Sequence, residues 1–416
     1  MASIARKNLF EDIPRFLVAQ GGIMFAVTLV AIQSGIFNGF IRSTALVIDE
    51  SEADIWIASD EMLHFELTHP IPVERLLQAR DLKGIARAEA LMLQSGRWRD
   101  SVGTIAPLRL IGFDPAGRLF HPWNVTQGSV SDLQQPYTII LDESTTGALN
   151  IDGVGATGEI NSLPATVVGL TQGTQSIASS AYTFTSLKNA NAYANSGVTS
   201  SVRCQVQPSG EIQCSNRYEK EPDRDNAEAP PTPRKLRASD LISYVLVEAK
   251  AGQDIEQLKQ RLEEKLPETR AYTRQEMADI TRNYWSTRTG IGFILGLGAG
   301  VGIIVGVAIV GQILYSSVSD RIKEFGTLKA MGASNRMLYS IIIEQALWMA
   351  LLGYAPGMLL CWGIATWTSV SVGITILITP VTAISVLGIT VAMCVGSAFF
   401  AIQKVTRVDP AIVFKA

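Results

Sequence analysis

SVSDRIKEFGTLKAMGASNRMLYSIIIE, residues 317–344, is a short charged connector between two long apolar runs. The runs at 289–315 and 337–365 are each long enough to cross a bilayer as a helix, which takes about 20 mostly apolar residues. Lysine and arginine that flank membrane helices mark the cytoplasmic side, because moving them across the membrane is costly. The connector carries four such basic residues, Arg321, Lys323, Lys329 and Arg336, and two acids, Asp320 and Glu324. The connector is therefore predicted to be the tip of a cytoplasmic helical hairpin.

A short amphipathic helix is expected inside the connector, over residues 320–331. Its apolar face is formed by residues three positions apart, Ile322, Phe325, Leu328 and Met331. Gly332 is a natural stop for this helix, and Ser334 can cap the next helix, which enters the membrane. A small helix that is tethered at both ends to membrane helices suits a lever pushed by a soluble partner.

The same residues resemble a known family pattern. R-x-K-E-F-G-x-L-K-A-M-G-A-S, residues 321–334, followed by Glu344, is similar to the coupling segment of the FtsX/MacB family of ABC-transporter permeases, and VDPAIVFKA, residues 408–416, resembles that family's C-terminal D-P-A motif. The resemblance implies a set of ATPase-coupling residues: Arg321, Lys323, Glu324, Phe325, Gly326, Leu328, Lys329, Ala330, Gly332, Ala333 and Glu344.

Four membrane helices and a large outer domain are expected from the hydropathy pattern. Mean hydropathy is +0.21, and charged residues make up 18% of the chain, which is typical of a membrane protein with a soluble portion. The predicted helices cover 16–42, 289–316, 337–365 and 378–402, with a coupling segment at 317–336. Gln20, Gln33, Ser34 and Asn38 interrupt the first helix, so one of its faces is expected to pack on protein rather than lipid.

The basic residues at both ends of the chain give the orientation. With an even number of membrane helices, they place both termini in the cytoplasm and residues 43–286 outside. Residues 1–15 are predicted to form an amphipathic helix on the cytoplasmic membrane face. A cleavable signal peptide is disfavoured, because the apolar run that follows is too long. Residues 403–416 form a cytoplasmic tail.

The outer domain is predicted to have an α+β fold split into two lobes. Short β-rich runs at 53–59, 107–114, 137–143 and 165–171 alternate with helical patterns at 72–82 and 187–194. Residues 244–266 read as a strand, a glycine turn and a helix. The apolar face of this helix consists of Ile255, Leu258, Leu262 and Leu266. Residues 216–237 are rich in charge and proline and cannot bury a core, so they are expected to form an exposed or disordered insert.

Two of the four cysteines lie in the outer domain. Cys204 and Cys214 flank QVQPSGEIQ, whose Pro-Ser-Gly is a turn signal, so the two can face each other across a hairpin. In an oxidising periplasm a disulfide is plausible, and two unpaired thiols are the alternative. Cys361 and Cys394 lie in apolar runs and are expected to be packing residues.

The second membrane helix is rich in glycine at four-residue spacing. One row consists of Gly292, Gly296 and Gly300, and a second row consists of Gly298, Gly302 and Gly306. Such rows let helix backbones approach closely, so this helix is expected at a helix–helix interface, and we expect that interface to be the seam of a homodimer. A nucleotide-binding glycine loop is excluded, because no strand precedes these glycines.

Enzymatic and nucleic-acid functions find no support in the sequence. No GxxxxGK[ST] loop is present, the net charge of −3 does not favour nucleic acid, and three histidines without a Cys/His cluster argue against a zinc site. The chain is expected to be a non-catalytic subunit that binds no cofactor and no metal itself. ATP and Mg²⁺ are expected on the partner ATPase.

The resemblance implies the permease subunit of a tripartite ABC exporter in a bacterial inner membrane, working as a homodimer. It implies an ABC ATPase, a periplasmic membrane-fusion adaptor and a TolC-like outer-membrane channel as partners, besides membrane lipids. The arrangement is similar to DevC proteins, in which the ATPase is a separate chain, and the cargo would be a glycolipid or another amphiphile. The alternative is an FtsX-like permease that transports nothing and regulates a periplasmic cell-wall hydrolase. A sensor without an ATPase would leave the connector unexplained.

Overall fold

The computed structural model describes residues 13–196, 200–206, 212–218, 232–320, 322–371 and 376–406. The chain divides into two compact units. A membrane unit contains Met1–Phe40 and Thr289–Ala416, and an outer unit contains Ile41–Arg288. Residues 1–12 of the predicted N-terminal helix and residues 407–416 of the predicted cytoplasmic tail, including the D-P-A motif, lie outside the described residues.

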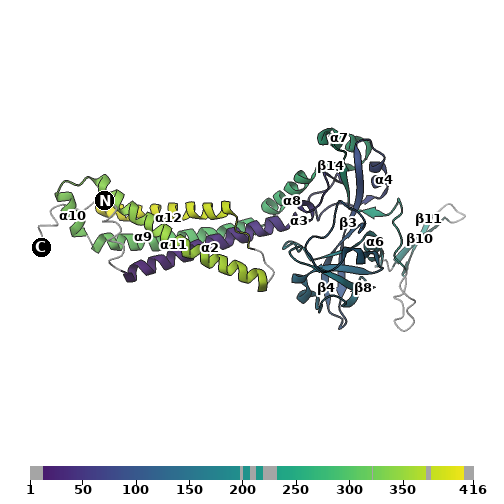
Figure 1. Ribbon diagram of the computed structural model, residues 1–416, viewed down its shortest axis with the longest axis horizontal. Helices are drawn as coiled ribbons and strands as arrows, with labels where there is room; N and C mark the ends of the chain where they lie inside the picture. The colour runs from purple at the N-terminus through teal and green to yellow at the C-terminus, as the bar shows by residue number, and fades with distance from the viewer. Residues whose placement is uncertain are drawn as a thin grey trace. The chain divides into compact units, whose positions relative to one another are not determined.

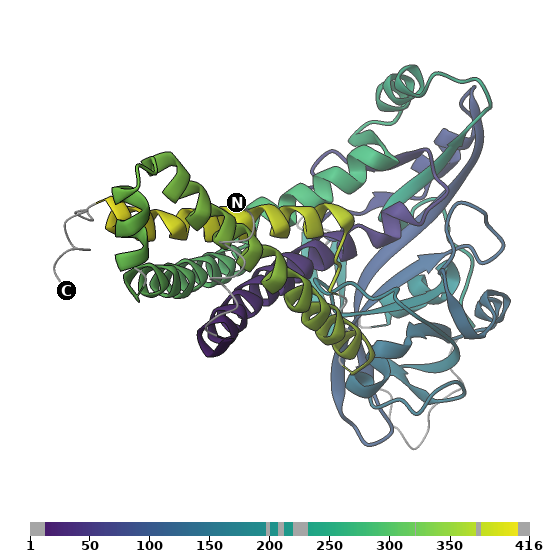
Figure 2. The same cartoon turned by 60° about the vertical axis from the view of Figure 1, so that its left-hand side comes forward.

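Within the described residues, four helices of the membrane unit are long and apolar enough to cross a bilayer. They are α2 (Ile13–Ser43), α9 (Ile291–Asp320), α11 (Asn335–Ser371) and α12 (Pro380–Thr406). The short helix α10 (Ile322–Ala330) lies at the end of the bundle where α9 ends and α11 begins (Figure 1, Figure 2). Helix α9 extends four residues beyond the predicted end at 316, so the coupling segment begins later than expected.

Helix α2 contacts the other helices through the polar residues that interrupt its apolar run. Gln20 Nε2 donates a hydrogen bond to the carbonyl oxygen of Met349 in α11, at 3.5 Å. At the other end of the helix, Asn38 Nδ2 donates to Thr382 Oγ1 in α12, at 2.9 Å. Interhelical hydrogen bonds of this kind satisfy groups that lipid cannot. The prediction that one face of this helix packs on protein is confirmed.

The outer unit is built on a ten-stranded sheet within the described residues, in the order β14-β1-β13-β3-β4-β9-β6-β8-β5, with β7 pairing β3 and β8. Two small sheets pair β10 with β11 and β12 with β2. The strands are β1 (Ile55–Ser59), β2 (Ile71–Pro72), β3 (Ile85–Arg99), β4 (Ile105–Phe113), β5 (Val125–Gly128), β6 (Thr138–Asp142), β7 (Thr157–Ile160), β8 (Leu163–Thr171), β9 (Ala181–Ser186), β10 (Ser200–Val206), β11 (Ile212–Tyr218), β12 (Leu241–Ile242), β13 (Tyr244–Ala249) and β14 (Thr269–Thr273).

Short helices complete the outer unit. They are α3 (Leu46–Asp49), α4 (Glu74–Arg80), α5 (Thr146–Leu149), α6 (Leu187–Asn195), α7 (Ile255–Lys265) and α8 (Arg274–Arg288), with 3₁₀ turns η1 (Val130–Gln134) and η2 (Glu143–Thr145). The predicted apolar face of α7 is buried, because Leu258 and Leu262, and Leu266 just beyond the helix, are each 0% exposed. Asp254 caps this helix by accepting a hydrogen bond from the Gln257 amide.

Strand β3 joins the two lobes of the outer unit. Its first half pairs antiparallel with β13, from Ile85 to Leu91, and its second half pairs with β4, from Met92 to Arg99. A single long strand thus belongs to both lobes, and the chain order places this sheet between the first two membrane helices. The predicted fold class, four membrane helices with a large α+β domain between helices one and two, is confirmed.

Candidate functional site

The connector between α9 and α11 is a helix with a fixed turn at its end. The Ala333 amide donates to the Leu328 carbonyl at 2.9 Å, and the Gly332 amide donates to the Lys329 carbonyl at 3.1 Å. Gly332 has a φ of +93°, a left-handed conformation that glycine adopts without strain. This hydrogen-bond pair is the Schellman arrangement that closes helix C-termini. The turn therefore holds α10 at a defined angle to α11.

Ser334 begins the next helix as the sequence predicts. Its Oγ accepts a hydrogen bond from the Met337 amide at 3.4 Å, and its carbonyl accepts from the Leu338 amide at 3.3 Å. A side-chain oxygen at this position satisfies an amide that has no partner within the helix. Two local signals, one at each side of Ala333, thus determine how α10 turns into α11.

One side of α10 belongs to the core of the membrane unit. Phe325 is 4% exposed and packs in the same apolar cluster as Val318 of α9 and Leu338 of α11, with Leu328 against its edge. Met331 does not share this face, because its side chain is 72% exposed. The predicted four-residue apolar face is wrong at this position. Helix α10 ends at Ala330, so Met331 lies in the turn beyond it and leaves the helical face.

The other side of the connector is exposed. We call the exposed residues Glu324, Thr327, Ala330 and Met331 the α10 outer surface. Of the predicted coupling residues, Gly326 is buried with Phe325, Lys329 and Ala333 are partly buried, and Gly332 is exposed. Arg321 and the side chain of Lys323 lie outside the described residues. The connector thus joins a core-facing side to a side that a soluble partner can reach.

Glu344 lies in α11, nine residues beyond the first residue of the helix, and is half-buried. At about 1.5 Å per residue this position is roughly 13 Å along the helix. Glu344 forms no ion pair with the described residues. The structure therefore keeps it on the helix that leaves the connector but does not join it to the α10 outer surface.

The two glycine rows of α9 have different surroundings. A methyl group added at Gly302 would lie 3.0 Å from Leu29 of α2, and one at Gly306 would collide with Met393 of α12. By contrast, nothing lies within 4 Å of such a group at Gly296 or Gly300 among the described residues. The row of Gly298, Gly302 and Gly306 therefore packs inside the chain's own bundle. The row of Gly292, Gly296 and Gly300 stays a prediction for the dimer seam.

The sequence did not predict a second glycine contact, between α11 and α2. A methyl group at Gly353 of α11 would lie 2.5 Å from Ile23 of α2, and one at Gly357 would lie 2.8 Å from Val27. The two helices are also joined by a hydrogen bond, which Thr28 of α2 donates to the Gly357 carbonyl at 3.0 Å. The four-residue spacing of these two glycines is the signal that could have identified the contact.

The outer unit's first and last helices are bonded to each other. Arg282 of α8 forms an ion pair with Asp49 of α3, and Arg274 Nη1 donates to the Ser51 carbonyl at 2.7 Å. More than 220 residues separate the partners in each pair, so no local sequence signal could predict these contacts. Helix α3 follows α2 and α8 precedes α9, so the clasp lies where the chain enters and leaves the outer unit.

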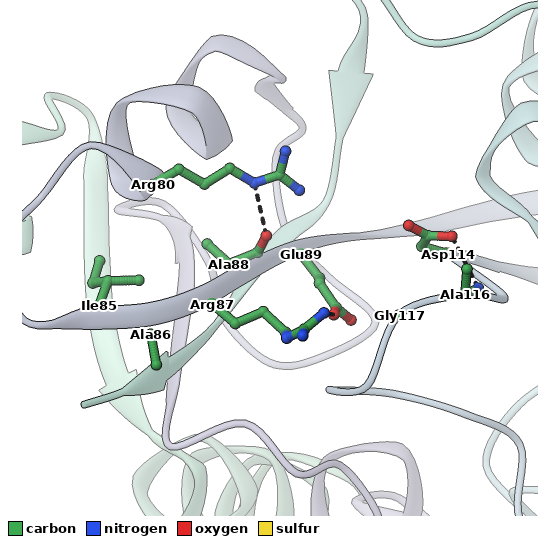
Figure 3. A pocket seen from close by; sticks show the side chains of 9 residues that line it. All are labelled: Arg80, Ile85, Ala86, Arg87, Ala88, Glu89, Asp114, Ala116 and Gly117. Atoms are coloured by element: carbon green, nitrogen blue, oxygen red, sulfur yellow. Dashed lines mark hydrogen bonds and ion pairs between the residues drawn. The ribbon is translucent and has the colours of Figure 1, made fainter. Parts of the chain in front are cut away.

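A polar cavity of about 360 Å³ opens beside the start of β3, between α4 and the loop after β4 (Figure 3). Its charged groups already have partners. Arg80 Nε donates to the Ala88 carbonyl at 2.9 Å. The buried Glu89 carboxylate accepts from the Arg118 and Leu119 amides at 2.8 and 3.0 Å. These contacts fix the loop after β4 and indicate a structural role for the cavity's side chains.

Cys204 and Cys214 lie directly opposite each other in the antiparallel register of β10 and β11. Their side chains lie outside the described residues, so the disulfide stays a prediction. No group of three or more metal-ligating side chains occurs in the part of the chain that the structure describes.

Comparison with known proteins gives two family matches. The model of the FtsX-like permease C-terminal domain matches residues 291–410, and that of the MacB-like periplasmic core domain matches residues 16–265. The second match covers more than half of the chain. No match was found among curated proteins.

Solved structures show weak similarity. The periplasmic region of MacB from Actinobacillus actinomycetemcomitans is 14% identical, with a TM-score of 0.33, and the similarity covers 58% of this chain and 97% of that one. The extracellular domain of the ABC-type transporter YknZ from Gram-positive bacteria is 12% identical, with a TM-score of 0.33, and covers 53% of this chain and 99% of that one. On the two family matches, the chain belongs to the FtsX/MacB family of ABC-transporter permeases.

Proposed function

We propose that this chain is the permease subunit of an ATP-driven ABC exporter of the tripartite type, and that it moves a glycolipid or a similar amphiphile. The observation that carries the proposal is the two-sided connector. Phe325 is fixed in the membrane core, while Met331 and its neighbours on the α10 outer surface are exposed. A rigid helix held at both ends transmits a push on its exposed side to the helices that anchor it.

The path from the connector to the outer unit follows the chain. Motion of α10 reaches α9 through the shared cluster of Phe325 and Val318. Helix α9 then connects through two residues, Thr289 and Gly290, to α8 of the outer unit. The clasp between Arg282 and Asp49 links α8 to α3. A displacement of α9 would therefore act on both points where the chain passes between the membrane unit and the outer unit.

The proposed setting is a bacterial inner membrane with both termini in the cytoplasm. An ABC ATPase would bind the α10 outer surface, with ATP and Mg²⁺ held by that ATPase. The outer unit would dock a periplasmic membrane-fusion adaptor that leads to a TolC-like channel. The open glycine row at Gly296 and Gly300 supports a homodimer through α9.

Lipid and metabolite profiling of a strain that lacks the chain tests this function. The proposal predicts that one class of amphiphile accumulates in the inner membrane and returns to normal when the parent chain is restored. An unchanged profile together with altered cell-wall hydrolysis would instead identify an FtsX-like regulator.

A further inference from the structure

The turn after β1 exposes two leucines on an otherwise well-packed outer unit. Leu63 and Leu67 are 56% and 49% exposed, whereas His64 and Phe65 between them are 5% and 0% exposed. The Leu63 amide donates to the Leu67 carbonyl at 3.0 Å, and the Leu67 amide donates to the His64 carbonyl at 2.9 Å. The backbone therefore closes on itself in a tight turn, in which the two leucines are exposed while His64 and Phe65 are buried.

This turn is held from several directions. The Phe65 amide donates to Thr281 Oγ1 of α8 at 3.2 Å, and the Phe65 carbonyl accepts from the Tyr244 hydroxyl of β13. Glu66 is held at two points. Its backbone carbonyl accepts a hydrogen bond from Arg109 of β4, and its carboxylate accepts one from the Tyr182 hydroxyl of β9, 2.8 Å away. Such anchoring excludes a loose loop as the reason for the leucines' exposure.

Aromatic rings of α8 border the same turn. The His64 imidazole stacks on the Tyr284 ring with centroids 4.2 Å apart, and lies edge-on to Trp285 at 5.6 Å. Both α8 side chains are partly exposed. We call Leu63, Leu67, Tyr284 and Trp285 the leucine–aromatic surface. Clustered apolar exposure of this kind marks a surface that contacts something other than water.

Covalent connectivity limits how far this surface can lie from the membrane. Trp285 precedes Ile291, the first residue of α9, by six positions. An extended chain spans at most about 3.6 Å per residue, so Trp285 lies within roughly 20 Å of the start of a membrane helix in any arrangement of the two units. Tryptophan and tyrosine are enriched at the level of the lipid headgroups. Arg288, exposed at the end of the same helix, suits the phosphates found there.

We propose that the leucine–aromatic surface inserts into the headgroup–acyl boundary of the leaflet that adjoins the outer unit. The occupant of the surface is lipid, and its presence holds α8 and the turn at a fixed depth. This contact goes beyond the proposed function, because it holds for an exporter and for a regulatory permease alike.

The test uses the full chain in lipid nanodiscs, with Cys204 and Cys214 replaced by serine. The fluorescence that comes from labelling of the remaining native cysteines is subtracted from each signal. An environment-sensitive fluorophore is attached at Leu67→Cys. The control is Leu77→Cys in α4, whose parent side chain is similarly exposed, at 45% against 49%. The proposal predicts emission at shorter wavelength for position 67 than for position 77, and quenching by lipids brominated on their acyl chains at position 67 only.

Two results would overturn the proposal. One is a probe at position 67 with the same emission and the same lack of quenching as the probe at position 77. The other is a water-shielded probe that brominated lipids fail to quench, since that result would show a protein occupant. A Leu63→Ser/Leu67→Ser double variant gives a second check. While the chain stays folded by circular dichroism, quenching of intrinsic tryptophan fluorescence by brominated lipids should fall relative to the parent.

Discussion

Arg282 of α8 donates a hydrogen bond from Nη2 to Oδ2 of Asp49 in α3 across 2.5 Å, although the two residues are 233 positions apart in sequence. Arg282 also contacts Asp279 on its own helix at 3.2 Å. About a third of each side chain of the Arg282–Asp49 pair is exposed. The pair joins the first and last helices of the outer unit, next to the points where the chain passes to and from the membrane unit.

Removal of either charge should weaken this clasp modestly. For Asp49→Asn and Arg282→Gln we expect a loss of about 0.5–1 kcal/mol in the free energy of unfolding, because solvent screens a partly exposed pair. The charge-swapped double variant Asp49→Arg/Arg282→Asp should recover part of the loss. Thermal unfolding of the full chain, recorded at low and high salt, measures both effects. A loss in the charge-swapped chain equal to the sum of the losses of its component single variants, Asp49→Arg and Arg282→Asp, would show that the pair contributes nothing.

Helix packing at Gly353 should be sensitive to one added methyl group. Gly353→Ala would bring that group to 2.5 Å from Ile23 Cγ2, so α2 and α11 must separate. We expect destabilisation of about 1–3 kcal/mol, as for overpacked cores. The matched control is Gly363→Ala in the same helix, where nothing lies within 4 Å among the described residues. Thermal stability in detergent compares the two. A Gly353→Ala chain as stable as the control would contradict the close approach.

The sequence predicts the connector well because its determinants are local. Gly332 and Ser334 act through hydrogen bonds to residues within five positions, so their roles as helix stop and helix cap can be read without the fold. The exposure of Met331 could not be predicted in this way, since a helix that ends one residue earlier moves that side chain off the apolar face. Boundaries of short helices are set by such single residues.

Contacts between distant segments were outside the reach of the sequence. Strand β3, Ile85–Arg99, is absent from the sequence-based predictions because alanine, glutamate, leucine and arginine in this segment favour helix, and pairing with β13 and β4 overrides that preference. Four-residue glycine spacing is likewise ambiguous. It identified Gly302 as a packing residue but gave no means to separate that row from the open row at Gly296.

His64 should make the outer unit less stable in acid. Burial, together with the nearby Arg109 guanidinium, lowers the pKa of His64 from 6.5 to about 4. In the unfolded chain the imidazole takes up a proton near pH 6.5, so the stabilising effect of neutral His64 is complete above that pH and is lost as pH falls toward 4. The loss by pH 4 is on the order of 3 kcal/mol.

Unfolding measured from pH 4 to 7 checks this dependence. Relative to the parent, His64→Gln should show a flatter stability profile across that window. His69→Gln is the control, because this histidine is exposed and pairs only with exposed Glu61 among the described residues. Identical slopes for the parent and His64→Gln would exclude His64 as the cause.

The β10–β11 hairpin should carry a disulfide when the outer unit faces an oxidising compartment. Directly opposite residues of antiparallel strands have Cα atoms about 4.5–5.5 Å apart, within the range that a disulfide spans. Because Cys204 and Cys214 are paired in register, we expect both to resist alkylation until reduced. Mass spectrometry of alkylated peptides with and without reductant reads this directly. Alkylation of both thiols without reductant would exclude the bond.

The proposed transmission through the connector should depend on the left-handed turn at Gly332. Alanine there costs about 1 kcal/mol in this conformation and should loosen the angle between α10 and α11. Asparagine tolerates the conformation and serves as the matched variant. Neither change alters the buried contact of Phe325, so the bundle should remain intact.

The most direct measurement is ATP turnover by the ABC ATPase that co-purifies with the full chain, compared in nanodiscs for the parent, Gly332→Ala, Gly332→Asn and Gly363→Ala. We predict that Gly332→Ala lowers turnover while the ATPase stays bound, and that Gly332→Asn and Gly363→Ala retain the parent rate. Co-purification of no ATPase, or equal turnover by all four chains, would contradict the claim that α10 couples an ATPase to the membrane helices.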